Sequence, residues 1–281
     1  SLPDNFIYTL SQDNNGYLWI GTAIGLTRFD GFDFTNVIFP DSVSGRSTTA
    51  SLKDKNGTLW FGCSDGSVFF MENGRMKRLS LQNTGSITKI LEGDDGYVYI
   101  VPREKAVFRI NKLKTDEITE LPLKSNLSFF SAFMPGDGKI LIGTEENILV
   151  CQVSEDSLSV KDVIGGFDYA PVLDIIPSGG DGRFIAGTDG NGLFRLEIAG
   201  AEKKVSRFEN FPELAALRVQ SFMKDNEGII WISTFESGII RLKMSDDSIN
   251  VQSVNSINKR SGLTGNDIRL VFQDIWGNYW I

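Results

Sequence analysis

One ten-residue unit recurs along this chain and constrains its fold more than any other feature. It reads D-N-N-G-Y-L-W-I-G-T at 13–22, D-K-N-G-T-L-W-F-G-C at 54–63, D-N-E-G-I-I-W-I-S-T at 225–234 and D-I-W-G-N-Y-W-I at 274–281. Three weaker copies keep the glycine, so the turn glycines fall at 16, 57, 96, 138, 182, 228 and 277, 39 to 49 residues apart. That period is typical of a four-stranded β-propeller blade.

Each copy parses into four short strands. Strand A precedes the aspartate, as at 6–12 and 268–273, and D-x-x-G then forms a tight hairpin. In this turn the aspartate side chain caps the backbone and the glycine takes a positive φ. Strand B is the L-W-I-G-T segment, strand C reads G-L-x-R-apolar, and strand D is more variable, as at 32–37 and 205–208. Stacked blades must bury their faces against one another, and the predicted large fillers are Trp19, Trp60, Trp231 and Trp280.

Counting the copies predicts an all-β, seven-bladed β-propeller of four-stranded antiparallel blades. We expect one domain over 1–281, with blades near 5–45, 46–85, 86–127, 128–170, 171–216 and 217–265, and a partial blade at 266–281. The last copy contains only strands A and B. We therefore expect a fragment of a longer protein, and self-association through the open blade edge, since unpaired strand edges invite pairing with another chain.

Composition narrows the classes of function. The net charge is −8, and 28 basic residues are scattered among 36 acidic ones, which disfavours binding to nucleic acid or to an anionic membrane. The absence of histidine removes the commonest general base and transition-metal ligand. No apolar run approaches the roughly 18 residues of a membrane span. We predict no cofactor, no metal and no catalytic residue. Cys63 and Cys151 are expected to be buried thiols, although a disulfide stays open.

The pattern D-x-x-G-x-L-W-I-G-T-x-x-G-L-x-R-F-D-G at 13–31 resembles the two-component regulator propeller repeat. The L-P-D-N run at 2–5 and G-L-T-G-N-D-I at 262–268 are similar to the lead-in of that family's blades. The resemblance covers the whole chain. It is specific in the first, second, sixth and seventh copies and weak in the third to fifth.

The resemblance implies a periplasmic sensor of a hybrid two-component system, best known from gut Bacteroidetes. Such sensors carry two propellers, an immunoglobulin-like domain, a membrane span, a histidine kinase and a DNA-binding output. They detect glycan-derived oligosaccharides and switch on polysaccharide-utilisation genes. This chain would be most of the first propeller, with the second propeller and the immunoglobulin-like domain as partners, and it would meet the membrane only through other parts. Two alternatives stay open: a structural propeller that only packs against proteins, and a propeller glycoside hydrolase or lyase.

Binding residues are expected where the repeat is broken, on loops at one end of the blades. The B–C loops and the D–A loops share a face in propellers. The predicted ligand-binding residues on this face are Arg103, Glu104, Glu145, Tyr169, Asp189, Asn191, Phe235 and Glu236. The D–A loops also offer Arg46, Phe129, Asp168 and Arg218.

Other repeated residues are better explained by the fold. The D-x-x-G turns offer oxygens as calcium loops do, but a calcium loop needs a glutamate about twelve residues on, where the first copy has Ile24, so a hairpin turn is favoured. The strand C arginines are expected to bond acidic neighbours or outer-strand carbonyls and to serve the repeat. They are Arg28, Arg109, Arg195 and Arg241.

Overall fold

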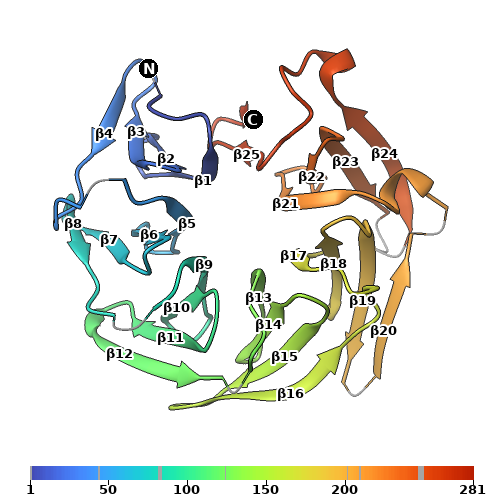
Figure 1. The fold of residues 1–281 in the computed structure, drawn as a ribbon, viewed down its shortest axis with the longest axis horizontal. Coiled ribbons are helices and arrows are strands. Elements are labelled where there is room, and N and C mark those ends of the chain that lie inside the picture. Colours follow the sequence, from blue (N-terminus) through green and yellow to red (C-terminus); the bar gives the residue numbers. More distant parts are fainter. Residues whose placement is uncertain are drawn as a thin grey trace. The chain divides into compact units, whose positions relative to one another are not determined.

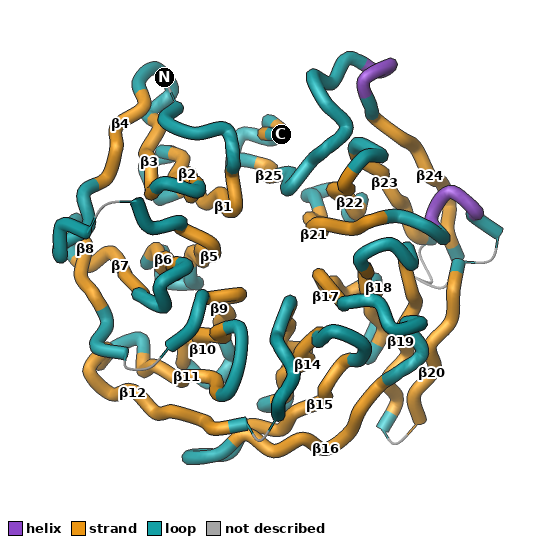
Figure 2. The backbone as a smooth tube through the Cα atoms, in the orientation of Figure 1, coloured by secondary structure: helices purple, strands orange, loops and turns teal. Residues whose placement is uncertain are grey.

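The computed structural model describes residues 2–43, 45–81, 84–123, 125–200, 202–208, 210–245 and 250–281. These residues form strands and loops, with two 3-10 turns of three residues each, η1 (Pro212–Leu214) and η2 (Lys259–Ser261) (Figure 2). Two compact units are present. The first spans 1–129, 136–139 and 152–159, and the second spans 130–135, 140–151 and 160–281.

Unit 1 contains three four-stranded antiparallel sheets, each ordered as the strands follow in sequence (Figure 1). The first is β1 (Ile7–Gln12), β2 (Leu18–Thr22), β3 (Gly25–Phe29) and β4 (Phe34–Val37). The second is β5 (Thr48–Lys53), β6 (Leu59–Cys63), β7 (Val68–Glu72) and β8 (Arg75–Arg78). The third is β9 (Ile87–Glu92), β10 (Tyr97–Pro102), β11 (Ala106–Asn111) and β12 (Lys114–Pro122).

Unit 2 contains two complete sheets and a short one. These are β17 (Val172–Pro177), β18 (Arg183–Thr188), β19 (Leu193–Ala199) and β20 (Glu202–Arg207); β21 (Arg218–Lys224), β22 (Ile230–Phe235), β23 (Ile239–Met244) and β24 (Val251–Ile257); and β25 (Phe272–Gln273) with β26 (Tyr279–Trp280). A further four-stranded sheet has residues in both units: β13 (Ser131–Gly136), β14 (Lys139–Gly143), β15 (Ile148–Val153) and β16 (Leu158–Ile164). Six four-stranded blades and a two-stranded seventh confirm the predicted fold class.

The D-x-x-G turn forms because its aspartate satisfies three donors at once. Asp54 Oδ1 accepts the backbone N–H groups of Asn56 (3.0 Å) and Thr58 (2.9 Å), and Oδ2 accepts the indole N–H of Trp60 (3.0 Å). Gly57 has φ 86°, a conformation that costs an L-residue a Cβ clash. The same bond from indole to aspartate joins the pairs Asp13–Trp19, Asp225–Trp231 and Asp274–Trp280. All seven predicted turn glycines have positive φ.

Hydroxyl groups on the inner strands link neighbouring blades within each unit. Thr49 Oγ1 donates to the carbonyl of Ile87 at 2.6 Å in unit 1. Ser131 Oγ donates to the carbonyl of Val172 at 2.8 Å in unit 2. Each bond satisfies a carbonyl where two inner strands meet, so polar contacts accompany the apolar packing between blades.

The core of each unit is formed by faces of adjacent sheets. In unit 1, Trp60 is 1 % exposed and packs among residues of β5 to β11, including Phe70 and Ile100. In unit 2, Ile185 and Ile230 are fully buried in a cluster that joins β18 to β23. The prediction of buried tryptophans is confirmed for Trp19, Trp60 and Trp231, whereas Trp280 is half-buried.

Three strand ranges were predicted wrongly. Strand D of the fifth blade was expected at 205–208, and β20 spans Glu202–Arg207. β4 begins at Phe34, because Asp30 Oδ1 accepts the N–H groups of Phe32 and Asp33 and holds those residues in a turn. β25 is limited to Phe272–Gln273 where 268–273 was expected. The residues before it bond to the sixth blade instead, since the N–H of Ile268 donates to the carbonyl of Thr234.

Candidate binding site

In unit 2, the loops inside the blades meet the connections between blades. The N–H of Gly192 donates to the carbonyl of Leu217 (3.1 Å), and the N–H of Gly238 donates to the carbonyl of Asn266 (2.8 Å). B–C loops and D–A connections therefore lie side by side here, as the sequence predicts. We call the polar and aromatic residues of these loops the loop arc: Asp168, Tyr169, Asp189, Asn191, Arg207, Arg218, Phe235, Glu236 and Asp267.

Tyr169 lies at one end of the loop arc and is held outward by an unusual backbone. Asp168 and Tyr169 have φ 54° and 61° in succession, and Tyr169 is 88 % exposed. The Asn191 amide donates to the carbonyls of Phe167 (3.2 Å) and Asp168 (3.1 Å), and the Arg207 guanidinium bonds the Asp168 carboxylate. Left-handed residues other than glycine persist only where the surroundings enforce them. The surrounding bonds thus fix the backbone that carries the exposed Tyr169 ring.

Arg218 occupies the middle of the loop arc. Its Nε donates to Asp189 Oδ1 at 2.9 Å, and its guanidinium carbon lies 4.5 Å from the centroid of the Phe235 ring. The hydrogen bond to Asp189 and the charge of that carboxylate raise the pKa of Arg218, so the guanidinium is charged at every accessible pH. Asp189 and Arg218 also form an isolated β-bridge between their loops. An oriented cation therefore covers one aromatic face, with its other N–H groups available.

Glu236 ends the loop arc on the B–C loop of the sixth blade. It has φ 73° and is exposed. Its backbone N–H donates to Asp267 Oδ1 at 2.8 Å. The loop arc thus alternates aromatic rings with planar charged groups over three consecutive blade junctions.

Five of the eight predicted binding residues belong to the loop arc: Tyr169, Asp189, Asn191, Phe235 and Glu236. Glu145 lies on the β14–β15 loop of the same unit and is half-buried. Arg103 and Glu104 are exposed on the β10–β11 turn of unit 1. The roles of all eight stay predictions, but the Asn191 amide is already engaged by the two carbonyls that support Tyr169.

Two residues that were predicted to be available on D–A loops are buried, and two residues of the loop arc were not predicted. Arg46 is 5 % exposed and Phe129 is fully buried, so these D–A residues serve packing. Arg207 was missed because it ends an outer strand, and its contact with Asp168 spans 39 residues. Asp267 was missed although it belongs to the repeated lead-in at 262–268, which was the available signal.

The strand C arginines share one contact that the sequence did not predict. Arg28, Arg109, Arg195 and Arg241 lie over the rings of Tyr17, Tyr97, Phe208 and Trp231, at 4.9, 4.6, 4.3 and 4.8 Å from the ring centroids. The expected carbonyl contact occurs at Arg109, which donates to the carbonyls of Ser154 and Glu155. Stacking on an aromatic ring is therefore the role that the repeat preserves.

The two thiols are far from reactive. Cys63 and Cys151 are buried and free, and burial raises the pKa of each to about 12. The residues that the structure describes include no group of three or more acidic, cysteine or histidine side chains placed to hold a metal ion. None of the described helical segments is long and apolar enough to cross a bilayer.

Comparison with known proteins places these features in context. Residues 1–23 match the family described as two component regulator propeller. No curated protein matches the chain by sequence. This match agrees with the resemblance of residues 13–31 to the two-component regulator propeller repeat.

Three solved structures share the fold. The extracellular domain of the putative hybrid two-component system BT3049 from B. thetaiotaomicron has a TM-score of 0.78 and 18% identity, covering 99% of this chain and 39% of that one. The corresponding domain of BT4673 from the same organism has a TM-score of 0.51 and 15% identity, covering 100% and 49%. The WD40 β-propeller domain of Doa1 has a TM-score of 0.69 and 14% identity, covering 98% and 89%. This chain spans less than half of either bacterial structure.

Proposed function

We propose that this chain, whose matches support the two-component regulator propeller family, is an extracytoplasmic recognition module of a hybrid two-component signalling protein. It detects an oligosaccharide at the loop arc and relays that event to a histidine kinase and a transcriptional output in other parts of the protein. The match at residues 1–23 supports the family, and the extracellular location given for two similar structures supports the compartment.

The observation that carries the proposal is the presentation of Tyr169. The Tyr169 ring is exposed, and two residues with positive φ and three hydrogen bonds from Asn191 and Arg207 fix the loop that carries it. Binding sites use such rigid rings as contact area at low cost in conformational entropy. The guanidinium of Arg218 and the carboxylates of Asp189 and Glu236 add planar donors and acceptors that suit sugar hydroxyl groups.

The charge of the loop arc indicates which sugars fit. Its carboxylates are those of Asp168, Asp189, Glu236 and Asp267, and its cations are Arg207 and Arg218, which gives 2 − 4 = −2. Both arginines are already bonded to a carboxylate. An anionic sugar would face uncompensated like charge, so the loop arc favours an uncharged oligosaccharide.

Isothermal titration calorimetry with a panel of neutral oligosaccharides tests this function. Tyr169→Ala should weaken binding of the recognised sugar by about tenfold or more, the effect of removing an anchor residue. Trp276→Ala is the matched control, because Trp276 is 66 % exposed but lies in a D-x-x-G turn. Equal affinity in the two variants, or no binding of any oligosaccharide, would contradict the proposal.

Product analysis distinguishes recognition from hydrolysis, the second candidate function. A glycosidase needs one carboxyl group with a raised pKa to act as the acid. Among the described residues, the carboxyl groups with a shifted pKa are all lowered, and none of them belongs to the loop arc. Burial opposes the shift in Asp41, Asp225 and Asp274, but hydrogen bonds prevail, and hydrogen bonds or a lysine dominate in Asp30, Asp94 and Glu117. Product analysis of the bound oligosaccharide after long incubation should show it intact.

A further inference from the structure

The outer edge of the first blade differs from most other blade edges. β4 has the sequence F-T-N-V and carries no charge, whereas the outer strands β8, β12, β16 and β20 each carry two to four charged residues. Charged residues on an edge strand discourage pairing with another strand. β24 is the other described outer strand without charge, but its apolar residues are half-buried. β4 is thus an exposed outer strand that has no charged residue to discourage pairing.

Exposed apolar side chains flank β4 at both ends. Phe32 is 92 % exposed just before the strand, and Ile38 is 82 % exposed just after it. β4 pairs with β3, and its other edge has no partner strand among the described residues. An unpaired edge between two exposed hydrophobic residues is the pattern of a strand-pairing surface.

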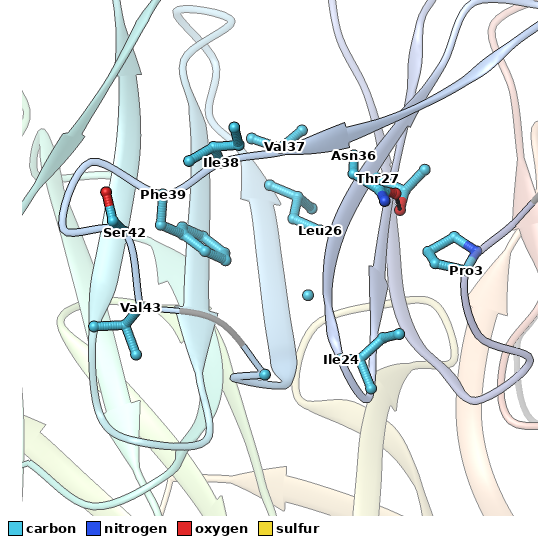
Figure 3. Close-up of a pocket in the computed structure, with 12 residues that line it drawn as sticks. Pro3, Ile24, Leu26, Thr27, Asn36, Val37, Ile38, Phe39, Ser42 and Val43 are labelled. Carbon is cyan, nitrogen blue, oxygen red and sulfur yellow. Dashed lines mark hydrogen bonds between the residues drawn. The ribbon is translucent and has the colours of Figure 1, made fainter.

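A small apolar cavity opens at the Ile38 end of β4. Its volume is about 180 Å³. Leu26 and Phe39 are buried in its wall, while Ile24, Ile38 and Val43 leave 52, 82 and 49 % of their surface exposed (Figure 3). A cavity of about 150 Å³ holds a benzene ring, and pockets for larger ligands span roughly 300–1,000 Å³. The cavity therefore fits one aromatic or branched side chain.

The cavity wall is held in place by a buried cation. The guanidinium of Arg46 lies 5.2 Å from the ring centroids of both Phe39 and Phe69. It bonds Asp41 and Asp65, each at 3.0 Å. Because these contacts fix the segment after β4, the cavity is preformed and does not depend on a partner to open it.

The register of the first sheet shows which backbone groups face outward. The N–H of Asp30 donates to the carbonyl of Asp33, and Arg28 lies opposite Thr35. Hydrogen bonding alternates along an antiparallel ladder, so Thr35 bonds inward and its neighbours Phe34 and Asn36 face outward. A second strand can therefore bond to Phe34 and Asn36 without disturbing β3.

We propose that two copies of this chain pair through their β4 edges about a two-fold axis at Thr35. Antiparallel pairing that sets Phe34 opposite Asn36 also brings the turn that carries Phe32 in one copy to the Ile38 end of β4 in the other. Each Phe32 ring then fills the cavity of the opposite copy, and the same contact is made twice, as two-fold symmetry requires. The occupant of the cavity is therefore a side chain of a second copy.

Sedimentation velocity over a concentration series of the 281-residue chain tests the pairing. The chain should dimerise as concentration rises, and Phe32→Ser should raise the dimer dissociation constant at least tenfold. Leu113→Ser removes an equally exposed residue (87 %) from another turn of unit 1 and should change nothing. Thr35→Lys should also give monomers, because like charges meet at the axis, whereas Gln252→Lys on β24 should not. A chain that stays monomeric, or a dimer indifferent to Phe32 and Thr35, overturns the proposal.

A cysteine at the axis tests the geometry directly. Directly opposed residues in a non-hydrogen-bonded antiparallel pair have Cα atoms about 4.5 Å apart, which a disulfide can span. Thr35→Cys should therefore form a linked dimer under mild oxidation, while Gln252→Cys should not. Cys63 and Cys151 are buried and do not interfere. If the two variants cross-link equally, the contact is collisional and the proposed pairing is wrong.

Discussion

The turns of the second and third blades reach similar geometry with different side chains. In the second, Asp54 opens the turn and accepts the Trp60 indole. In the third, Gly93 takes the position of that aspartate, and a Cβ there would lie 2.3 Å from Asp95 Oδ1. Asp95, inside the turn, accepts the hydroxyl of Tyr99 at 2.6 Å. The requirement is thus a carboxylate that bonds the strand B aromatic residue, whatever its position in the turn.

The two turns differ in whether water can reach the carboxylate. Asp54 is 4 % exposed, while Asp95 is exposed. A buried donor that loses its acceptor carries the full desolvation penalty, whereas an exposed group turns to water. Removing Asp54 leaves buried Trp60 without its acceptor, whereas removing the hydroxyl of the buried Tyr99 leaves only the exposed Asp95 without a partner. The first change should therefore cost more unfolding free energy than the second.

The largest expected effect is that of Asp54→Ala. The buried indole N–H of Trp60 and two part-buried backbone N–H groups lose their acceptor. The buried donor costs about 1–3 kcal/mol and the other two about 0.5–1.5 kcal/mol each, so the free energy of unfolding should fall by roughly 3 kcal/mol. Urea denaturation followed by tryptophan fluorescence measures this. If Asp54→Ala lowers the free energy of unfolding by less than Tyr99→Phe does, the expected difference between the two turns is wrong.

Glycine at the last turn position should matter equally in both blades. Gly57 and Gly96 have φ 86° and 88°, so alanine at either should cost about 1–2 kcal/mol in unfolding free energy. The new Cβ would meet the Asn14 amide in the second blade and nothing within 4 Å in the third. Because Asn14 is exposed and free to move, the two losses should agree within about 0.5 kcal/mol. Thermal melts of the two variants under the same conditions measure both losses. A difference clearly above about 0.5 kcal/mol would contradict the prediction.

Removing only the phenolic hydroxyl in the third blade should have a smaller effect. Tyr99→Phe deletes one hydrogen bond to a carboxylate that water can reach, at a cost of about 1 kcal/mol. Tyr97→Phe on the same strand is a suitable control. Denaturation midpoints at matched pH compare the two, and a loss as large as that of Asp54→Ala would mean that Asp95 is effectively buried.

The equivalent aspartate of the sixth blade, Asp225, can be tested by lowering the pH. This should give the smallest effect on the free energy of unfolding. Burial tends to raise the pKa of Asp225, but donors from Trp231, Ile229 and Tyr279 prevail and lower it below its ordinary value of 3.8. This carboxylate therefore stabilises the fold above that ordinary value, and the contribution is lost as the pH falls through the lowered pKa. Asp225→Asn should flatten the fall of unfolding free energy below about pH 4. If the slope of unfolding free energy against pH is the same in Asp225→Asn, the lowered pKa of Asp225 is contradicted.

The fold was largely predictable from sequence because its signals are local. The D-x-x-G aspartate and its tryptophan are six residues apart, and one hairpin brings them together. Where the copies are degenerate, as at Leu141 and Ile185 in the tryptophan position, only the spacing of the glycines indicated a blade. The site was less predictable, since its contacts join loops such as those of Asp189 and Arg218, 29 residues apart.

The repeat by itself determined the number of blades, the turns and the buried tryptophans, because each depends on residues within one hairpin or on stacking common to all blades. Tertiary structure alone decided that Arg46 is buried over two adjacent rings, that Asn191 supports the loop of Tyr169, and that a cavity opens beside β4. Each of these depends on the path of an irregular connection between blades. Such a path follows from packing against a neighbouring blade, which no short sequence pattern encodes.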